Sequence, residues 1–140
     1  MRSGPTVQLL ATLVAATLIL VGIIGFIPGL TTNLYDGLEF AGEDGNAEIL
    51  GVFETSILHN LVHLAFGLVG LAMARTWAGA RTFLIGGGII YLVLWLVGLL
   101  GGLSWIPVSD PDDWLHFVLG VAMIGLGIAT TREGTPRPTI

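Results

Sequence analysis

Three histidines lie in otherwise apolar stretches, where a polar side chain is costly to bury and usually faces a site or another helix. His59 and His63 are one helical turn apart, and His116 occurs in a later apolar stretch. Imidazole can ligate a metal ion or haem iron, hydrogen-bond to another helix, or exchange a proton near neutral pH. Helical spacing adds further polar side chains, and the candidate cluster comprises His59, Asn60, His63, Tyr91, Asp113 and His116.

Three roles are open for these histidines. The favoured role is structural: each ring hydrogen-bonds a polar neighbour and fastens two helices together. The second is ligation, in which His59, His63 and His116 bind a metal ion with a rim carboxylate, or two histidines from different helices hold haem. The third is titration, in which an outward-facing cluster beside carboxylates senses pH or relays protons. We predict no resident cofactor, with a metal ion or haem as the alternative.

The composition is that of a membrane protein. Of the 140 residues, 54% are hydrophobic and only 11% are charged, whereas soluble domains carry about 25% charged residues. The chain has no cysteine, which excludes disulfides and thiolate metal sites. A net charge of −5 without a basic patch argues against nucleic-acid binding.

The sequence lacks familiar signatures of catalysis. It contains no His-Glu-x-x-His zinc motif, phosphate-binding loop or Gly-x-Ser-x-Gly elbow. Serine is scarce and cysteine is absent, so few side chains could act as a nucleophile. We therefore predict a protein without enzymatic activity and assign no catalytic residue.

Four apolar runs are long enough to cross a bilayer, which takes roughly 17–25 helical residues. They cover about 7–27, 56–74, 82–106 and 114–130. The first is longer than the roughly 7–15 apolar residues of a signal peptide, so we expect a retained helix. These runs predict an all-α, four-helix transmembrane bundle in a single domain.

The connections between the runs are polar. Residues 30–53 indicate a solvated acidic loop without the acid spacing of an EF-hand, although the second helix could begin near Ala47. Residues 75–81 predict a short loop. An acidic turn at 107–113 would let Asp112 or Asp113 cap the last helix, and the tail at 131–140 is predicted to be disordered.

The basic residues predict the orientation. All five are arginines, and with four spans they fall on one side, at the two termini and in the 75–81 loop. Positively charged loops of membrane proteins stay in the cytoplasm. The charge pattern therefore predicts a multi-pass protein with both termini in the cytoplasm.

The two halves of the chain resemble each other. The tripeptide FIP at 26–28 ends the first span and WIP at 105–107 ends the third. In the second and fourth spans, a glycine follows one turn after His63 and one turn after His116. We predict two helical hairpins of the same orientation, as in membrane proteins built from parallel repeats. His63 and His116 are then counterparts, and His59 is an asymmetric addition.

Small residues share the polar faces, and they allow helix backbones to approach closely. Two pairs have the Gly-x-x-x-Gly spacing, Gly25 with Gly29 and Gly98 with Gly102. The predicted packing positions are Gly25, Gly29, Gly67, Gly70, Gly98, Gly102 and Gly120. Further glycines exceed what internal packing needs and favour contacts with a second copy or a larger complex, namely Gly86, Gly87 and Gly125.

Four motifs in this order carry a family resemblance: PGLTT at 28–32, HNLVH at 59–63, GGGIIY at 86–91 and DWLH at 113–116. Together they resemble a family of small bacterial, largely actinobacterial, four-helix membrane proteins known only as a domain of unknown function. The resemblance covers about 7–132. It implies a bacterial plasma-membrane protein and supplies no activity. The chain departs from the family pattern at 109–113, where SDPDD replaces an expected asparagine-containing turn.

These observations predict a non-enzymatic integral membrane protein. We expect it to act by helix packing, as a homo-oligomer or as an accessory subunit of a larger membrane complex, with the lipid bilayer as its surroundings and no nucleic acid as partner. The alternative is a metal- or haem-binding membrane protein that uses the histidine cluster.

Overall fold

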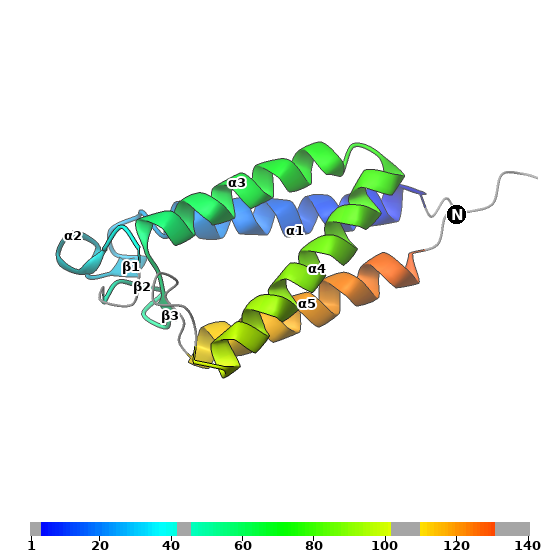
Figure 1. Cartoon of the computed structure of the whole chain (residues 1–140). Helices are drawn as coiled ribbons and strands as arrows, with labels where there is room; N and C mark the ends of the chain where they lie inside the picture. The colour runs from blue at the N-terminus through cyan, green and yellow to red at the C-terminus, as the bar shows by residue number, and fades with distance from the viewer. Residues whose placement is uncertain (1–3, 42–45, 102–109, 131–140) are drawn as a thin grey trace, which may run out of the picture.

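The computed structural model describes residues 4–41, 46–101 and 110–130 (Figure 1). The long helices are α1 (Gly4–Ile24), α3 (Ile57–Met73), α4 (Trp77–Leu99) and α5 (Asp110–Ala129). Between α1 and α3 lie the one-turn helix α2 (Leu34–Gly37) and three two-residue strands, β1 (Thr31–Thr32), β2 (Glu48–Ile49) and β3 (Phe53–Glu54). The predicted all-α architecture with four long helices is confirmed.

The helices α1 and α3 pack together as a first helical hairpin, and a glycine sets their distance. A Cβ atom at Gly67 would lie 2.5 Å from Ile19 Cγ1 and 2.7 Å from the Ala15 carbonyl oxygen, which leaves no room for a side chain. Nearer the other end of the pair, the Asn60 amide lies directly against Gly25. The backbones of α1 and α3 can therefore approach closely only because these two positions are glycines.

The second helical hairpin, formed by α4 and α5, repeats these contacts. A Cβ atom at Gly120 would lie 2.8 Å from Leu92 Cδ2 and 2.9 Å from the Gly88 carbonyl oxygen. The Asp113 carboxylate lies against Gly98 as the Asn60 amide lies against Gly25. Each of these contacts has a counterpart in the first hairpin. Subtracting 73 from the number of the α4 residue gives the corresponding α1 residue, and subtracting 53 from the number of the α5 residue gives the corresponding α3 residue. The two hairpins thus pack their helices in one register.

This register corrects one part of the sequence alignment. The contacts relate α3 to α5 by an offset of 53, which is also the offset between His63 and His116. They relate α1 to α4 by 73, whereas FIP and WIP are 79 residues apart in the sequence. The WIP tripeptide at 105–107 lies outside the described residues.

The two hairpins meet at the end that holds the beginning of α1 (Figure 1). Gln8 donates hydrogen bonds from Nε2 to the carbonyl oxygens of Ala74 at 3.1 Å and Arg75 at 2.8 Å. Arg81 donates from Nε to the Gly127 carbonyl oxygen at 3.1 Å. The start of α1, the α3–α4 turn and the end of α5 therefore share one end. Fully buried side chains between the hairpins include Val7, Ala11, Ala15, Ala80 and Leu84.

At the opposite end the two hairpins diverge, and a small antiparallel sheet lies beside the opening (Figure 1). Its strand order is β1-β2-β3, with Thr31 paired to Ile49. Leu50 and Gly51 have φ angles of 54° and 71°, which reverse the chain between β2 and β3. Thr31 Oγ1 donates to the Ile24 carbonyl oxygen at 2.8 Å and ties the sheet to the end of α1.

The region before α3 corrects two expectations. Residues 30–53 hold strands and a helical turn rather than a plain solvated loop. A start of the second long helix near Ala47 is wrong, because α3 begins at Ile57 and its N-cap is Ser56, whose Oγ accepts from the His59 amide at 3.1 Å. The Thr55 amide instead donates to the Ala47 carbonyl oxygen at 3.1 Å, so strand pairing keeps this stretch extended.

The third helix also differs from its expected bounds of 82–106. It begins at Trp77, because Thr76 Oγ1 accepts from the Gly79 amide at 2.9 Å and caps the first turn. The expected loop at 75–81 is therefore mostly helical. Its end at Leu99 precedes the expected one by seven residues, and Gly101 has a φ of +107°. The expected acidic turn at 107–113 is corrected in part, because α5 already begins at Asp110 and includes 110–113. The rest of that turn, the predicted tail at 131–140 and the packing position Gly102 lie outside the described residues.

Two glycines differ from their predicted roles. Gly29 has a φ of +88° and no neighbour within 4 Å of a Cβ atom placed there, so it serves a turn after α1 instead of helix packing. Gly87 is internal, because a Cβ atom there would lie 2.8 Å from Met123 Cε. A Cβ atom at Gly70 would lie 2.5 Å from Phe83 Cζ of the second hairpin. A Cβ atom at Gly86 or Gly125 meets nothing within 4 Å.

Leucine at Gly67 or Gly120 should destabilise the fold. Each side chain would force two helix backbones apart, and such overpacking costs about 1–3 kcal/mol. Thermal unfolding of the detergent-solubilised protein, followed by circular dichroism, measures the loss. Ala65→Leu is the control, because Ala65 is exposed on α3. Equal stability of Gly67→Leu and Ala65→Leu would contradict the close approach.

Candidate functional site

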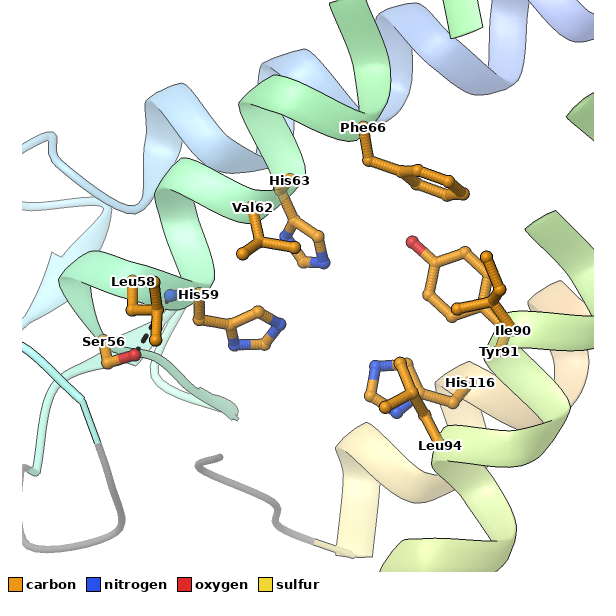
Figure 2. Close-up of a pocket in the computed structure, with 10 residues that line it drawn as sticks. All are labelled: Ser56, Leu58, His59, Val62, His63, Phe66, Ile90, Tyr91, Leu94 and His116. Atoms are coloured by element: carbon orange, nitrogen blue, oxygen red, sulfur yellow. Dashed lines mark hydrogen bonds between the residues drawn. The ribbon is translucent and has the colours of Figure 1, made fainter. Parts of the chain in front are cut away.

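A cavity of about 410 Å³ opens between α3 and α4, near the end where the two hairpins diverge. Figure 2 shows side chains of both helices and one of α5 pointing toward its interior. Its wall includes His59, His63 and Phe66 of α3, Tyr91 and Leu94 of α4, and His116 of α5.

A second cavity, of about 320 Å³, lies on the side of α1 and α5. Its wall is mostly aliphatic and includes Val14, Leu18 and Val21 of α1, Leu119 of α5, and Ile49, Leu50 and Phe53 of the sheet. His59, His63, Tyr91 and His116 line this cavity as well as the first. We call these four residues the ring cluster. They stand between two apolar cavities.

The rings of the cluster form two close pairs, one in each hairpin. The ring centroids of His59 and His63 are 4.4 Å apart with an angle of 53° between their planes. Those of Tyr91 and His116 are 5.4 Å apart, with an angle of 33°. Phe66 of α3 makes an edge contact with Tyr91, with centroids 6.1 Å apart. This contact of Phe66 with Tyr91 connects the first hairpin to the second beside the two pairs.

The ring cluster keeps hydrogen-bonding capacity that the described part of the chain does not use. The Nδ1 atoms of His63 and His116 are buried, and neither has a hydrogen-bond partner there. His116 is only 6% exposed. A buried polar atom without a partner costs about 1–3 kcal/mol, and such atoms are rare in native proteins. The expected structural role, a hydrogen bond from each ring to a neighbour, is not fulfilled by these two nitrogens.

Metal ligation finds no support in the arrangement of the described residues. Among them, no group of three or more His, Asp or Glu side chains lies close enough to hold a metal ion. The alternative of a metal or haem held by His59, His63 and His116 therefore remains a prediction, which elemental analysis and an absorption spectrum of the purified protein would test.

Asn60 and Asp113 belong to the predicted cluster but lie apart from the ring cluster. Each occupies the first turn of its helix and packs against a glycine of the neighbouring helix, Gly25 or Gly98. Asn60 is fully buried, and its Oδ1 accepts a hydrogen bond from Thr55 Oγ1 at 2.6 Å. These two polar side chains therefore contact the neighbouring helix of their own hairpin at a glycine.

Sequence reasoning missed several residues of this site. Thr55, which holds Asn60, had a usable signal because it directly precedes the N-cap Ser56. The aromatic and aliphatic wall residues Phe66 and Leu94 gave none, because any apolar helix carries such residues. The contribution of the sheet, through Ile49 and Phe53, depends on a fold of two-residue strands.

Comparison with known families finds one match: the family model described as "Domain of unknown function (DUF4383)" matches residues 8–129. No curated protein and no solved structure matches the chain. The matched range includes both cavities and the whole ring cluster.

Replacing Thr55 by valine should lower stability. The change keeps the shape of the side chain but leaves the buried Asn60 Oδ1 without its donor, which costs about 1–3 kcal/mol. Thr32→Val is the matched control, since Thr32 is exposed and its Oγ1 bond to the Glu48 carbonyl oxygen is long, at 3.3 Å. Thermal unfolding in detergent compares the two variants. A larger loss for Thr32→Val would contradict the anchoring role of Thr55.

Proposed function

Because the chain belongs to the family described as "Domain of unknown function (DUF4383)", whose description names no activity, we propose its function from its surface. It is a non-enzymatic, multi-pass protein of the bacterial plasma membrane. It acts through its helix faces, as a homo-oligomer or as an accessory subunit of a larger membrane complex. The observation that carries this proposal is the apolar outer surface of all four long helices.

Large apolar side chains point outward along every long helix. Examples are Leu13 and Leu20 on α1, Leu61 and Leu68 on α3, Val93 and Leu96 on α4, and Val118 and Ile128 on α5. In water, so large an apolar surface would be an aggregation hazard, whereas lipid chains cover it without cost. A membrane is therefore the surrounding that suits this surface.

The lengths of the helices are compatible with this proposal. Two stretches among the described residues, Thr6–Ile24 and Trp77–Leu99, are long and apolar enough to cross a membrane. The apolar parts of α3 and α5, Ile57–Met73 and Asp113–Ala129, are shorter, at 17 residues each. A helix of that length extends about 26 Å, near the lower limit for a bilayer span. Their packing against the longer helices supports four spans.

The distribution of charge supports cytoplasmic termini. Arg75 and Arg81 lie at the end that holds the start of α1 and the end of α5. The acidic side chains of Glu39 and Glu48 belong to the segment beside the opposite end. The positive-inside rule then places the arginine end in the cytoplasm. The sheet and the end where the two hairpins diverge then lie outside.

Two glycines support contacts with another helix. Gly86 on α4 and Gly125 on α5 have open space where a side chain would be, so the packing of this chain does not require them. Each costs helix stability relative to alanine, by about 1 kcal/mol. A partner helix that approaches closely at these positions would offset that cost.

The orientation can be measured with single cysteines, because the chain has none. Tyr35→Cys, at a position that is 86% exposed beside the sheet, should react with a membrane-impermeant maleimide in intact cells. Ala78→Cys, in the first turn of α4, should react only after the membrane is permeabilised. The reverse pattern would contradict the proposed orientation, and release of the protein by alkaline carbonate would contradict membrane insertion.

Association should depend on the two glycines with open space. We expect Gly86→Leu or Gly125→Leu to reduce the crosslinked oligomer at least several-fold while leaving the fold of the chain intact. Ala65→Leu, which adds bulk on an exposed position of α3, is the control. Native mass spectrometry of the wild-type protein in mild detergent reports the assembly. A wild-type protein that is always a free monomer would contradict the accessory role.

A further inference from the structure

We use the word cleft for the two cavities between the helical hairpins taken together. We propose that this cleft binds an uncharged lipophile made of a hydrogen-bonding ring and an alkyl tail, the chemistry of a quinone. The ring lies at the ring cluster, and the tail lies in the cavity on the side of α1 and α5. The inference rests on the proposed membrane location only for the route of entry.

The size of the cleft suits such a ligand. Its two cavities measure about 410 and 320 Å³ and share four wall residues, so they form adjoining compartments. Small-molecule sites in proteins are typically about 300–1,000 Å³ and mostly apolar, with a few polar groups that fix orientation. Here the polar groups converge at the junction of the two compartments.

Two histidines of the ring cluster, His63 and His116, offer hydrogen bonds that the described residues do not use. His116 is more than nine-tenths buried, and its Nδ1 atom and that of His63 have no partner among the described residues. Figure 2 shows the imidazole rings of His63 and His116 and the Tyr91 hydroxyl around the space between the hairpins. Neutral imidazole both donates and accepts. Oxygen atoms on a bound ring would therefore find partners from both hairpins.

The ligand should carry no charge. Among the described residues, no Asp, Glu, Lys or Arg side chain lines either cavity. Moving an ionised group into such apolar surroundings without a counter-charge is strongly unfavourable. A phosphate, a carboxylate or an ammonium headgroup would be excluded, whereas carbonyl and hydroxyl groups need only the hydrogen bonds that the ring cluster supplies.

The two compartments differ in chemistry. The first presents aromatic faces, with Phe66 beside the ring cluster, and aromatic rings favour offset or edge contacts with another flat ring. The second presents the aliphatic side chains of α1 and the sheet. Val62 and Ile90, on the wall of the first compartment, are each 52% exposed on the outer surface, so the ligand can enter sideways from the bilayer.

Binding is tested with the full chain in lipid nanodiscs, with empty nanodiscs to subtract partition into lipid. The probe is a benzoquinone with a ten-carbon chain, and the control is decylbenzene, which carries the same chain on a six-membered ring without oxygen atoms. We expect the quinone to bind at least tenfold more tightly than decylbenzene, which is the effect of one or two hydrogen bonds. Similar affinities for the two probes would overturn the proposal.

Two pairs of variants locate the site. Tyr91→Phe removes one hydroxyl and should weaken quinone binding roughly two- to tenfold, whereas Tyr35→Phe removes a hydroxyl from an exposed position and should not. Leu94→Trp fills the first compartment and should abolish binding, whereas Leu96→Trp adds the same ring to an exposed position of α4. Circular dichroism shows whether each variant is folded.

Other outcomes overturn the assignment. Equal binding by Tyr91→Phe and Tyr35→Phe, or full binding by Leu94→Trp, would remove the ligand from the cleft. A Soret band or a stoichiometric metal in the purified protein would assign the histidines to haem or metal instead. Failure of quinone binding would leave the cysteine labelling pattern unchanged, so it is distinguishable from failure of the proposed membrane orientation.

Discussion

The structure depends on the close approach of two helix backbones at Gly67 and at Gly120. At these points α1 touches α3, and α4 touches α5, with no side chain between them. Each hairpin is thereby a tightly packed unit, and most of the described core that the two units share lies toward one end. Because the hairpins diverge from that core, small residues cannot bring them into contact at the other end. The side chains with rings line the space that remains, and the cleft is therefore a consequence of how each hairpin packs internally.

The polar side chains of α3 and α5 face two different directions. Asn60 and Asp113 face the partner helix within their own hairpin, where each rests on a glycine. His63 and His116 follow three residues later, which turns them about 60° around the helix and toward the opposite hairpin. The amide and the carboxylate therefore contact the helix within their own hairpin, whereas the two imidazoles line the space between the hairpins.

Much of this fold could be predicted, because long apolar runs identify helices and repeated histidine and glycine positions pair them. The same signals predict that His63 and His116 occupy equivalent positions in the two hairpins. The sheet could not be predicted, since strands of two residues have no periodicity and the reversal at Leu50 uses a residue that seldom adopts a positive φ. Gly29 shows a related limit, because a small residue in a helical stripe can equally serve a turn. The cleft depends on the angle between hairpins, which no local pattern encodes.

The duplicated scaffold has one unequal part. Asn60 follows Gly25 by 35 residues, whereas Asp113 follows Gly98 by only 15. The extra length of the first connection includes the sheet, and Ile49, Leu50 and Phe53 from it cover one compartment and not the other. Two equivalent hairpins alone would allow a bound ligand two equivalent orientations between them. The unequal connection removes that degeneracy, so a ligand with two different ends would be held in a single direction.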